Sequence, residues 1–195
     1  MKKSAKIILG VLVLSAASYG IYYWISASSV PQSFNDARSE GALISSQIVA
    51  LLGDSLKGLE TISEEDRNYN FSKAFDLVLD ELNRTKIARE KALDLSSALD
   101  KMARAVKDIS PTKARNIAMQ AVSQEVSLIG NLVVYNDTLR GLLETLRYKF
   151  SGDIRYDADD VQKLIVSLNK KAKEITSLND SFNGIMGEFD KLVNK

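Results

Sequence analysis

The chain contains no cysteine and no histidine, and this double absence removes several kinds of chemistry. Without cysteine there is no disulfide framework, no thiolate nucleophile and no iron–sulfur or cysteine-ligated zinc site. Without histidine there is no Ser-His-Asp triad, no imidazole base and no histidine-ligated metal. The sequence also lacks a glycine-rich phosphate loop and a G-x-S-x-G nucleophile motif. We therefore predict a protein that is not an enzyme and has neither a cofactor nor a metal site.

The chain also has almost no net charge and few prolines. The 26 Lys and Arg residues nearly balance the 25 Asp and Glu residues, so no excess of positive charge indicates a nucleic-acid partner. Hydrophobic residues make up 45% of the chain, which is too many for a disordered protein. The chain has only two prolines, and no useful length of it alternates polar and apolar residues as a strand does. These features predict an all-α fold.

The beginning of the chain has the pattern of a membrane anchor. The segment from Ile7 to Ile25 is uncharged, and about 20 apolar residues are needed to cross a bilayer as a helix. We predict a transmembrane helix over residues 7–29, preceded by a cytoplasmic tail of residues 1–6. A cleaved signal peptide is the alternative, since Ser15-Ala16-Ala17 and Ile25-Ser26-Ala27 resemble cleavage sites.

The two flanks of this segment predict its orientation. Basic residues precede it, whereas aromatic residues that favour the membrane interface gather toward its other end: Lys2, Lys3 and Lys6, then Tyr19, Tyr22, Tyr23 and Trp24. Because positive charge stays on the cytoplasmic side, the N-terminus is expected inside. We therefore predict a single-pass protein of the inner (cytoplasmic) membrane whose C-terminal domain is periplasmic or extracellular.

Residues 32–195 are predicted to form an elongated antiparallel four-helix bundle with coiled-coil-like packing. Apolar residues recur at steps of three and four over four segments, at about 32–62, 66–109, 111–150 and 157–194. Ser63 and Asp66 resemble a capping box before the second helix, and Ser110-Pro111 is expected to cap the third. Short junctions between long helices make neighbouring helices antiparallel.

The threading of this bundle places basic residues near the membrane. If the first helix leaves the bilayer at Gln32, the turn at Ser110-Pro111 returns toward it. Five basic residues surround that turn and are candidates for contact with anionic lipid: Lys101, Arg104, Lys107, Lys113 and Arg115. The alternative is that they form an ordinary solvated face.

The opposite end of the bundle combines acidic residues with three tyrosines. The tyrosines Tyr69, Tyr148 and Tyr156 are candidate partner contacts, because exposed aromatic side chains supply recognition area. They could equally pack against the end of the bundle. The acids at 153, 157, 159 and 160 lack the ligand order of an EF-hand, and helix capping accounts for at least two of them, so no calcium site is predicted.

Glu125 is the only acid that falls on an apolar stripe, between Ala121 and Leu128. No second acid or histidine accompanies it, so a metal site is not predicted. We interpret it as a buried polar residue that fixes the register of the bundle.

The stretch Tyr135-Asn136-Asp137-Thr138-Leu139-Arg140, followed by Phe150, resembles the tyrosine–asparagine stretch in the last helix of LemA-type proteins. The members of that family are N-terminally anchored helical proteins with an extracytoplasmic domain, so the resemblance implies the same architecture. It covers one helix at most. Ser151 stands where the family has a proline, the second asparagine is absent, and another predicted helix follows.

Long amphipathic helices without reactive residues favour a structural or interaction module of the cell envelope, a scaffold or adaptor that binds another envelope protein or a second copy of itself. One alternative is a ligand-sensing bundle that signals through a partner. A core cavity with convergent polar groups would favour that alternative. Another is a phage-type lysis or exclusion component.

Overall fold

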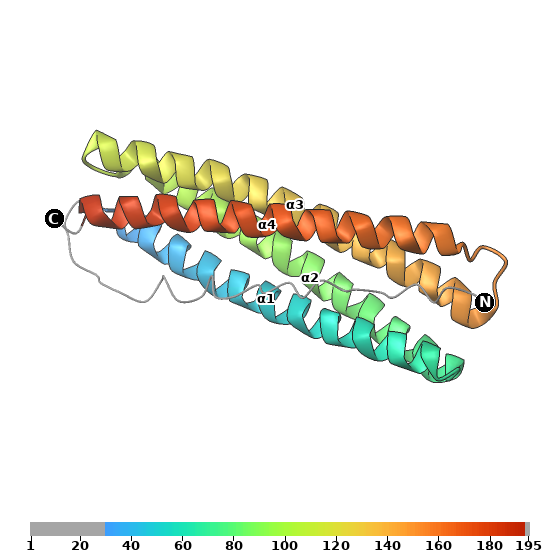
Figure 1. Ribbon diagram of the computed structural model, residues 1–195. Helices are drawn as coiled ribbons and strands as arrows, with labels where there is room; N and C mark the ends of the chain where they lie inside the picture. Colours follow the sequence, from blue (N-terminus) through green and yellow to red (C-terminus); the bar gives the residue numbers. More distant parts are fainter. Residues whose placement is uncertain (1–29, 194–195) are drawn as a thin grey trace.

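A computed structural model describes residues 30–193, and these residues fold into four long helices (Figure 1). The helices are α1 (Gln32–Arg67), α2 (Phe71–Ala105), α3 (Thr112–Ser151) and α4 (Ala158–Val193), and the short 3-10 helix η2 (Val106–Asp108) extends α2. No strand occurs between residues 30 and 193. The predicted cytoplasmic tail and transmembrane segment, with their lysines and aromatic residues, lie outside the described residues.

Each helix packs antiparallel on the next one along the chain, α1 on α2, α2 on α3 and α3 on α4. This confirms the predicted all-α fold of antiparallel helices. Figure 1 shows an elongated molecule in which the start of α1, the α2–α3 turn and the end of α4 share one end, here called the proximal end. The α1–α2 and α3–α4 turns lie at the other end, here called the tip.

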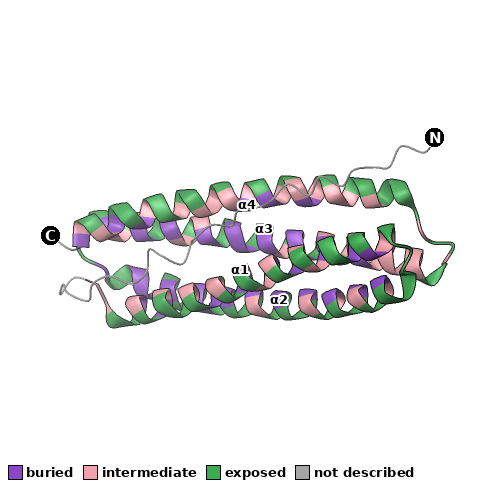
Figure 2. Cartoon of the chain, turned by 60° about the horizontal axis from the view of Figure 1, so that its bottom comes forward, coloured by how far each residue is buried: buried purple, intermediate pink, exposed green. Residues whose placement is uncertain are grey.

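The buried residues form stripes along the inner faces of the helices (Figure 2). On α3 the stripe begins with Ala114, Ala118 and Ala121, which are fully buried and allow close approach of the neighbouring helices. Met119 and Val126 lie beside this stripe, but both are 58% exposed. They fall on the outer side of a helix that has one narrow buried face.

The α1–α2 turn differs from its prediction. The helix α1 runs through Ser63 and Asp66 to Arg67, so these residues do not cap α2. Glu65 is buried and accepts hydrogen bonds from Asn70 (2.7 Å) and Lys73 (2.6 Å), which fold the turn back onto the last residues of α1. Tyr69 takes the left-handed backbone conformation, with φ of 61°.

The turns on either side of α3 follow different rules. Ser110 does not cap α3, because Pro111 itself holds the N-cap position and its carbonyl accepts a hydrogen bond from the Arg115 amide (3.1 Å). At the other end Gly152 stops the helix. It has φ of 70°, and the Asp153 amide donates back to the Tyr148 carbonyl (2.9 Å), as in a Schellman motif.

Among the described helices, α1 and α3 are long and apolar enough to cross a membrane. The core helices of soluble bundles have the same length and composition, so this property does not place either helix in a bilayer.

Candidate functional site

A cavity of about 490 Å³ lies between the four helices, in the half of the bundle nearer the proximal end. Its wall is mainly apolar and is built from all four helices, by Ile48 and Leu52 of α1, Leu95, Leu99 and Met102 of α2, Leu128 and Leu132 of α3, and Ile175 and Met186 of α4. This volume lies in the range of small-molecule sites, about 300–1,000 Å³.

The carboxyl of Glu125 belongs to the wall of this cavity. Glu125 stands on the inner stripe of α3, where the sequence placed it, and is only 8% exposed. No residue between 30 and 193 donates a hydrogen bond to it or forms a salt bridge with it, and burial raises the pKa of its carboxyl to about 7. Burial disfavours the ionised form, although the carboxyl oxygens are not among the fully buried atoms without a partner. The predicted role in helix register therefore lacks a bonding partner.

Polar side chains of α4 also line the cavity. Thr176, Asn179, Asp180 and Asn183 all belong to its wall, and Ser45 adds a hydroxyl from α1. These side chains offer donors and acceptors on one side of an otherwise apolar space. This combination is typical of sites that orient a small ligand.

The proximal end of the cavity is closed by two contacts between α1 and α4. The rings of Phe34 and Phe189 are both almost fully buried, and their centroids lie 5.4 Å apart. Beside them Arg38 donates two hydrogen bonds to the Asp190 carboxylate, at 2.7 and 2.8 Å. A two-pronged pair of this kind fixes geometry as well as charge. Both residues line the cavity, and the Asp190 carboxylate compensates the charge of Arg38.

A second acid is buried at the interface of α1 and α2. Glu81 is 4% exposed, and its Oε1 atom lies 3.2 Å from Nη1 of Arg84. The side chain fills space left by Gly58, where an added Cβ would lie 2.1 Å from Oε1 of Glu81. Burial raises the pKa of Glu81, while Ser55 and Arg84 oppose that rise.

Glu81 was not predicted as a buried residue, although the sequence contained a signal. It follows Val78 by three residues and precedes Thr85 by four, which is the spacing of the buried stripe of α2. The polar wall of α4 was also overlooked. Its residues Thr176, Asn179, Asp180 and Asn183 recur at steps of three and four beside the apolar stripe.

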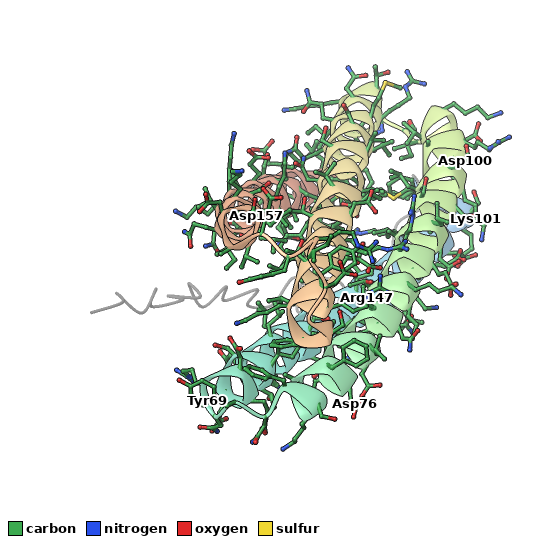
Figure 3. All side chains as sticks on the ribbon, turned by 90° about the vertical axis from the view of Figure 1, so that its right-hand side faces the viewer. Tyr69, Asp76, Asp100, Lys101, Arg147 and Asp157 are labelled. Atoms are coloured by element: carbon green, nitrogen blue, oxygen red, sulfur yellow. The ribbon has the colours of Figure 1, made fainter. Side chains whose placement is uncertain are left out.

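The five basic residues predicted to face lipid surround the α2–α3 turn at the proximal end. Two of them are paired with carboxylates, Lys101 with Glu40 of α1 (2.8 Å) and Arg104 with Asp100 (2.9 Å). Asp100 and Lys101 lie side by side on α2 (Figure 3). Lys107 and Lys113 are exposed, and Arg115 donates to the Lys107 carbonyl (3.3 Å). The basic surface without a paired carboxylate is therefore smaller than the sequence suggested.

The three candidate tyrosines have different surroundings at the tip. Tyr69 is 80% exposed, whereas Tyr148 and Tyr156 are half-buried beneath basic side chains, with the Arg155 guanidinium 4.1 Å from the Tyr148 ring centroid. In the end-on view Tyr69 lies well apart from Asp157 at the start of α4 (Figure 3). The structure therefore does not bring the three tyrosines into one exposed patch.

The acidic residues of the tip serve local structure. Asp153 binds the Arg155 side chain (2.6 Å), and these hydrogen bonds lower the pKa of its carboxyl to about 2. The Asp157 carboxylate accepts a hydrogen bond from the Asp159 amide (2.8 Å) at the start of α4. No group of three possible metal ligands occurs within the described part of the chain.

The residues that resemble the LemA-type stretch lie on α3 beyond the cavity. Tyr135 and Asn136 are both 6% exposed, and the Asn136 Oδ1 atom has no hydrogen-bond donor among the described residues. Neither belongs to the cavity wall.

The chain matches no family model, no curated protein and no solved structure. Function must therefore be argued from the cavity and its residues alone.

Proposed function

We propose that this chain is a single-pass envelope protein whose helical bundle binds a small amphipathic molecule in its core cavity and reports the binding to a partner protein. The observation that carries this proposal is the Glu125 carboxyl, which is buried without a bonding partner in the wall of a 490 Å³ cavity. This reverses the order favoured by the sequence, in which a scaffold came first and a sensing bundle second.

The cost of these features supports ligand binding over a purely structural role. A cavity inside a helical bundle lowers stability because its lining side chains lose packing contacts. A buried carboxyl without a partner lowers stability further, and a leucine of similar size would pack better. A scaffold needs neither feature, whereas a binding site needs both the space and the polar group.

The proposed placement in the cell rests on residues 1–29. We take residues 7–29 as the transmembrane helix of the inner membrane, with the N-terminus in the cytoplasm and the bundle in the periplasm or outside the cell. We propose that the signal passes to another envelope protein. We place the basic turn with Lys107 and Lys113 near the anionic membrane surface.

The absence of cysteine gives a direct test of this placement. We expect a membrane-impermeant maleimide to label a Ser151→Cys variant in intact spheroplasts, because Ser151 is exposed at the tip. The matched Ser4→Cys variant should be labelled only after the membrane is permeabilised. The reverse order would show that the bundle lies inside the cell.

Methionine methyl groups provide the test of ligand binding. Met102 and Met186 line the cavity, whereas Met119 is 58% exposed on the outer side of α3. With 13C-methyl methionine in the full chain, held in phosphatidylcholine nanodiscs, we expect hexan-1-ol to shift the signals of Met102 and Met186 and leave Met119 unchanged.

A matched pair of α1 variants controls for effects outside the cavity. Ala42→Phe places a ring in the cavity wall and should abolish the shifts, while Ala50→Phe on the exposed side of the same helix should preserve them. Shifts that are absent from the wild type, or unaffected by Ala42→Phe, would refute cavity binding.

A scaffold or adaptor role remains the second candidate, favoured by the exposed aromatic side chains of the α1–α2 turn. Tyr69 is 80% exposed, and its ring contacts Phe71, which is itself 44% exposed (centroids 6.1 Å apart). A photo-crosslinking amino acid at position 69 should then give a product of defined mass in membranes, with an envelope partner or a second copy. The same group at Leu93, which is 64% exposed on α2, should not.

A further inference from the structure

We infer that the cavity takes an organic ammonium ion, whose apolar body packs on the leucines and whose amine binds the Glu125 carboxylate. This inference rests on the proposed ligand-binding function and adds the chemical class of the ligand. It is carried by two observations that point the same way, the bonding state of Glu125 and the balance of charge around the cavity.

The charges that line the cavity leave a negative excess. Among the lining residues the only cation is Arg38, and both of its hydrogen bonds go to Asp190. Glu125 and Asp180 then remain without a cation in the wall, the first buried and the second exposed at the edge. The lining therefore favours a positively charged group inside the cavity.

An anionic ligand would fit this wall badly. A fatty acid or phosphate would bring a second negative charge next to Glu125, in a space where no lining cation is free to bind it. Like charges at close range repel, and more strongly than in bulk water where the surrounding protein lowers the dielectric constant. A neutral ligand would avoid this repulsion but would leave the carboxylate unpaired.

An ammonium ion supplies what Glu125 lacks. It carries a positive charge and up to three hydrogen-bond donors, and the carboxylate has no donor among the described residues. Thr176, Asn179 and Asn183 line the same cavity on α4, and their oxygen atoms are acceptors of the kind that the remaining donors of the amine require. The protein already bears the cost of burying the carboxyl, so the site is prepared for the ligand before it binds.

The apolar part of the wall sets the rest of the ligand. Leucines from α2 and α3, at 95, 99, 128 and 132, surround the space with Ile48 and Ile175. A short alkyl chain or a single ring would bury its surface against these side chains. The ligand class is thus an amine with an apolar body of about six carbons, a size that suits a site of a few hundred Å³.

Binding of such an ion should be linked to the ionisation of Glu125. Burial raises the pKa of this carboxyl to about 7, so about a tenth of it is ionised at pH 6 and about nine-tenths at pH 8. The other titratable groups of the wall are Arg38 on α1 and Asp180 and Asp190 on α4, and α2 contributes none. We expect about a tenfold rise in affinity for the ammonium ion between these pH values.

Three probes that differ only in their head group test the inference. Hexylammonium, hexan-1-ol and hexanoate share one alkyl chain and carry positive, zero and negative charge. Titrated at pH 8 into the full chain in phosphatidylcholine nanodiscs, hexylammonium should shift the Met102 and Met186 methyl signals with about tenfold higher affinity than hexan-1-ol, since hydrogen bonds between charged groups are the stronger ones. Hexanoate should bind most weakly.

Two acid variants locate the responsible charge. Glu125→Gln should bring hexylammonium and hexan-1-ol within about twofold of each other and should remove the pH dependence. Asp180→Asn removes an acid of the same charge from the exposed edge and should preserve the preference for the ammonium. If Glu125→Gln does not fold, the head-group order and the pH profile of the wild type still decide the question.

The outcomes separate this inference from the proposed function. Equal affinity of wild type for hexylammonium and hexan-1-ol, or an ammonium preference that survives in Glu125→Gln, overturns the ammonium class while cavity binding stands. Silence of Met102 and Met186 toward all three probes overturns the proposed function itself.

Discussion

The two glutamates Glu81 and Glu125 are both buried in the bundle, but their surroundings differ. Glu81 fits the space that Gly58 leaves between α1 and α2, 3.2 Å from Arg84. Glu125 lines a cavity, and no described residue donates a hydrogen bond to it. Burial raises the pKa of both carboxyls, but Ser55 and Arg84 limit the rise only at Glu81.

This difference separates a structural acid from a candidate binding residue. Glu81 is packed between two helices with Arg84 beside its Oε1 atom, although its Oε2 atom is buried without a hydrogen-bond partner among the described residues. Glu125 lines a cavity, so the cost of burying its carboxyl is offset only when a ligand enters that cavity. The distribution of partners therefore says more about the role of each residue than burial does.

The largest expected difference between the two acids is in how the free energy of unfolding changes with pH. The pKa of Glu125 is raised from an unfolded value of 4.5 to about 7, so the folded state holds a proton that the unfolded state has lost in this interval. The free energy of unfolding should therefore fall as pH rises from 5 to 7.5, on the order of 3 kcal/mol at most. Thermal unfolding of the full chain, followed by circular dichroism across this range, measures it.

The same contrast predicts how variants of the two acids change the slope of the free energy of unfolding against pH. Glu125→Gln should remove most of it, and Glu81→Gln a smaller part, because the Glu81 pKa is raised against opposing contacts. The lowered pKa values of Glu65, Asp153 and Glu174 act below pH 4.5, outside this interval. An unchanged slope in Glu125→Gln would show that the cavity already supplies a partner for its carboxyl.

Replacement of each acid by leucine should have different effects on stability at pH 8. Glu125→Leu removes a buried charge and fills part of the cavity, so we expect the free energy of unfolding to rise by about 2 kcal/mol. Glu81→Leu leaves Arg84 without its partner and should give no such gain. Equal effects of the two variants, measured by urea unfolding, would erase the distinction between the sites.

A pair of glycine variants tests the fit around Glu81 with a smaller expected effect. Gly58→Ala would force the Glu81 side chain out of its space, whereas an added Cβ at Gly53 meets no atom within 4 Å. Gly53→Ala should stabilise the helix by up to about 1 kcal/mol, as alanine does relative to glycine. We expect Gly58→Ala to be less stable than Gly53→Ala by about 1–2 kcal/mol in thermal unfolding.

The smallest expected effect is at Ser55, which is 4% exposed and opposes the raised pKa of Glu81. Ser55→Ala should cost about 1 kcal/mol, the usual contribution of one hydrogen bond. It should leave hexylammonium binding unchanged, since Ser55 does not line the cavity. Altered binding in this variant would mean that the two sites are coupled through α1.

The sequence predicted the bundle well because helical spacing is a local property. The four apolar stripes follow from residues three and four apart, and the antiparallel packing of the helices follows from short turns. The α1–α2 turn was misplaced because Glu65 looks like a surface acid until Asn70 and Lys73 fold back to bind it.

The candidate site was only half visible in the sequence. Glu125 stood out on its stripe, but whether such an acid meets a partner or an open space depends on three other helices. The cavity arises because α1 and α4 stand apart above the Phe34–Phe189 contact, and no local pattern encodes that separation.

The Arg38–Asp190 pair has a mechanical consequence. It joins the beginning of α1 to the end of α4, residues 152 positions apart in the chain. If residues 7–29 hold the protein in a bilayer, any pull from that side enters the bundle at Gln32, beside this pair and the Phe34–Phe189 contact. The force is then shared with α4 and acts along the helix axes. In this direction many contacts must break together, so α1 does not separate one turn at a time.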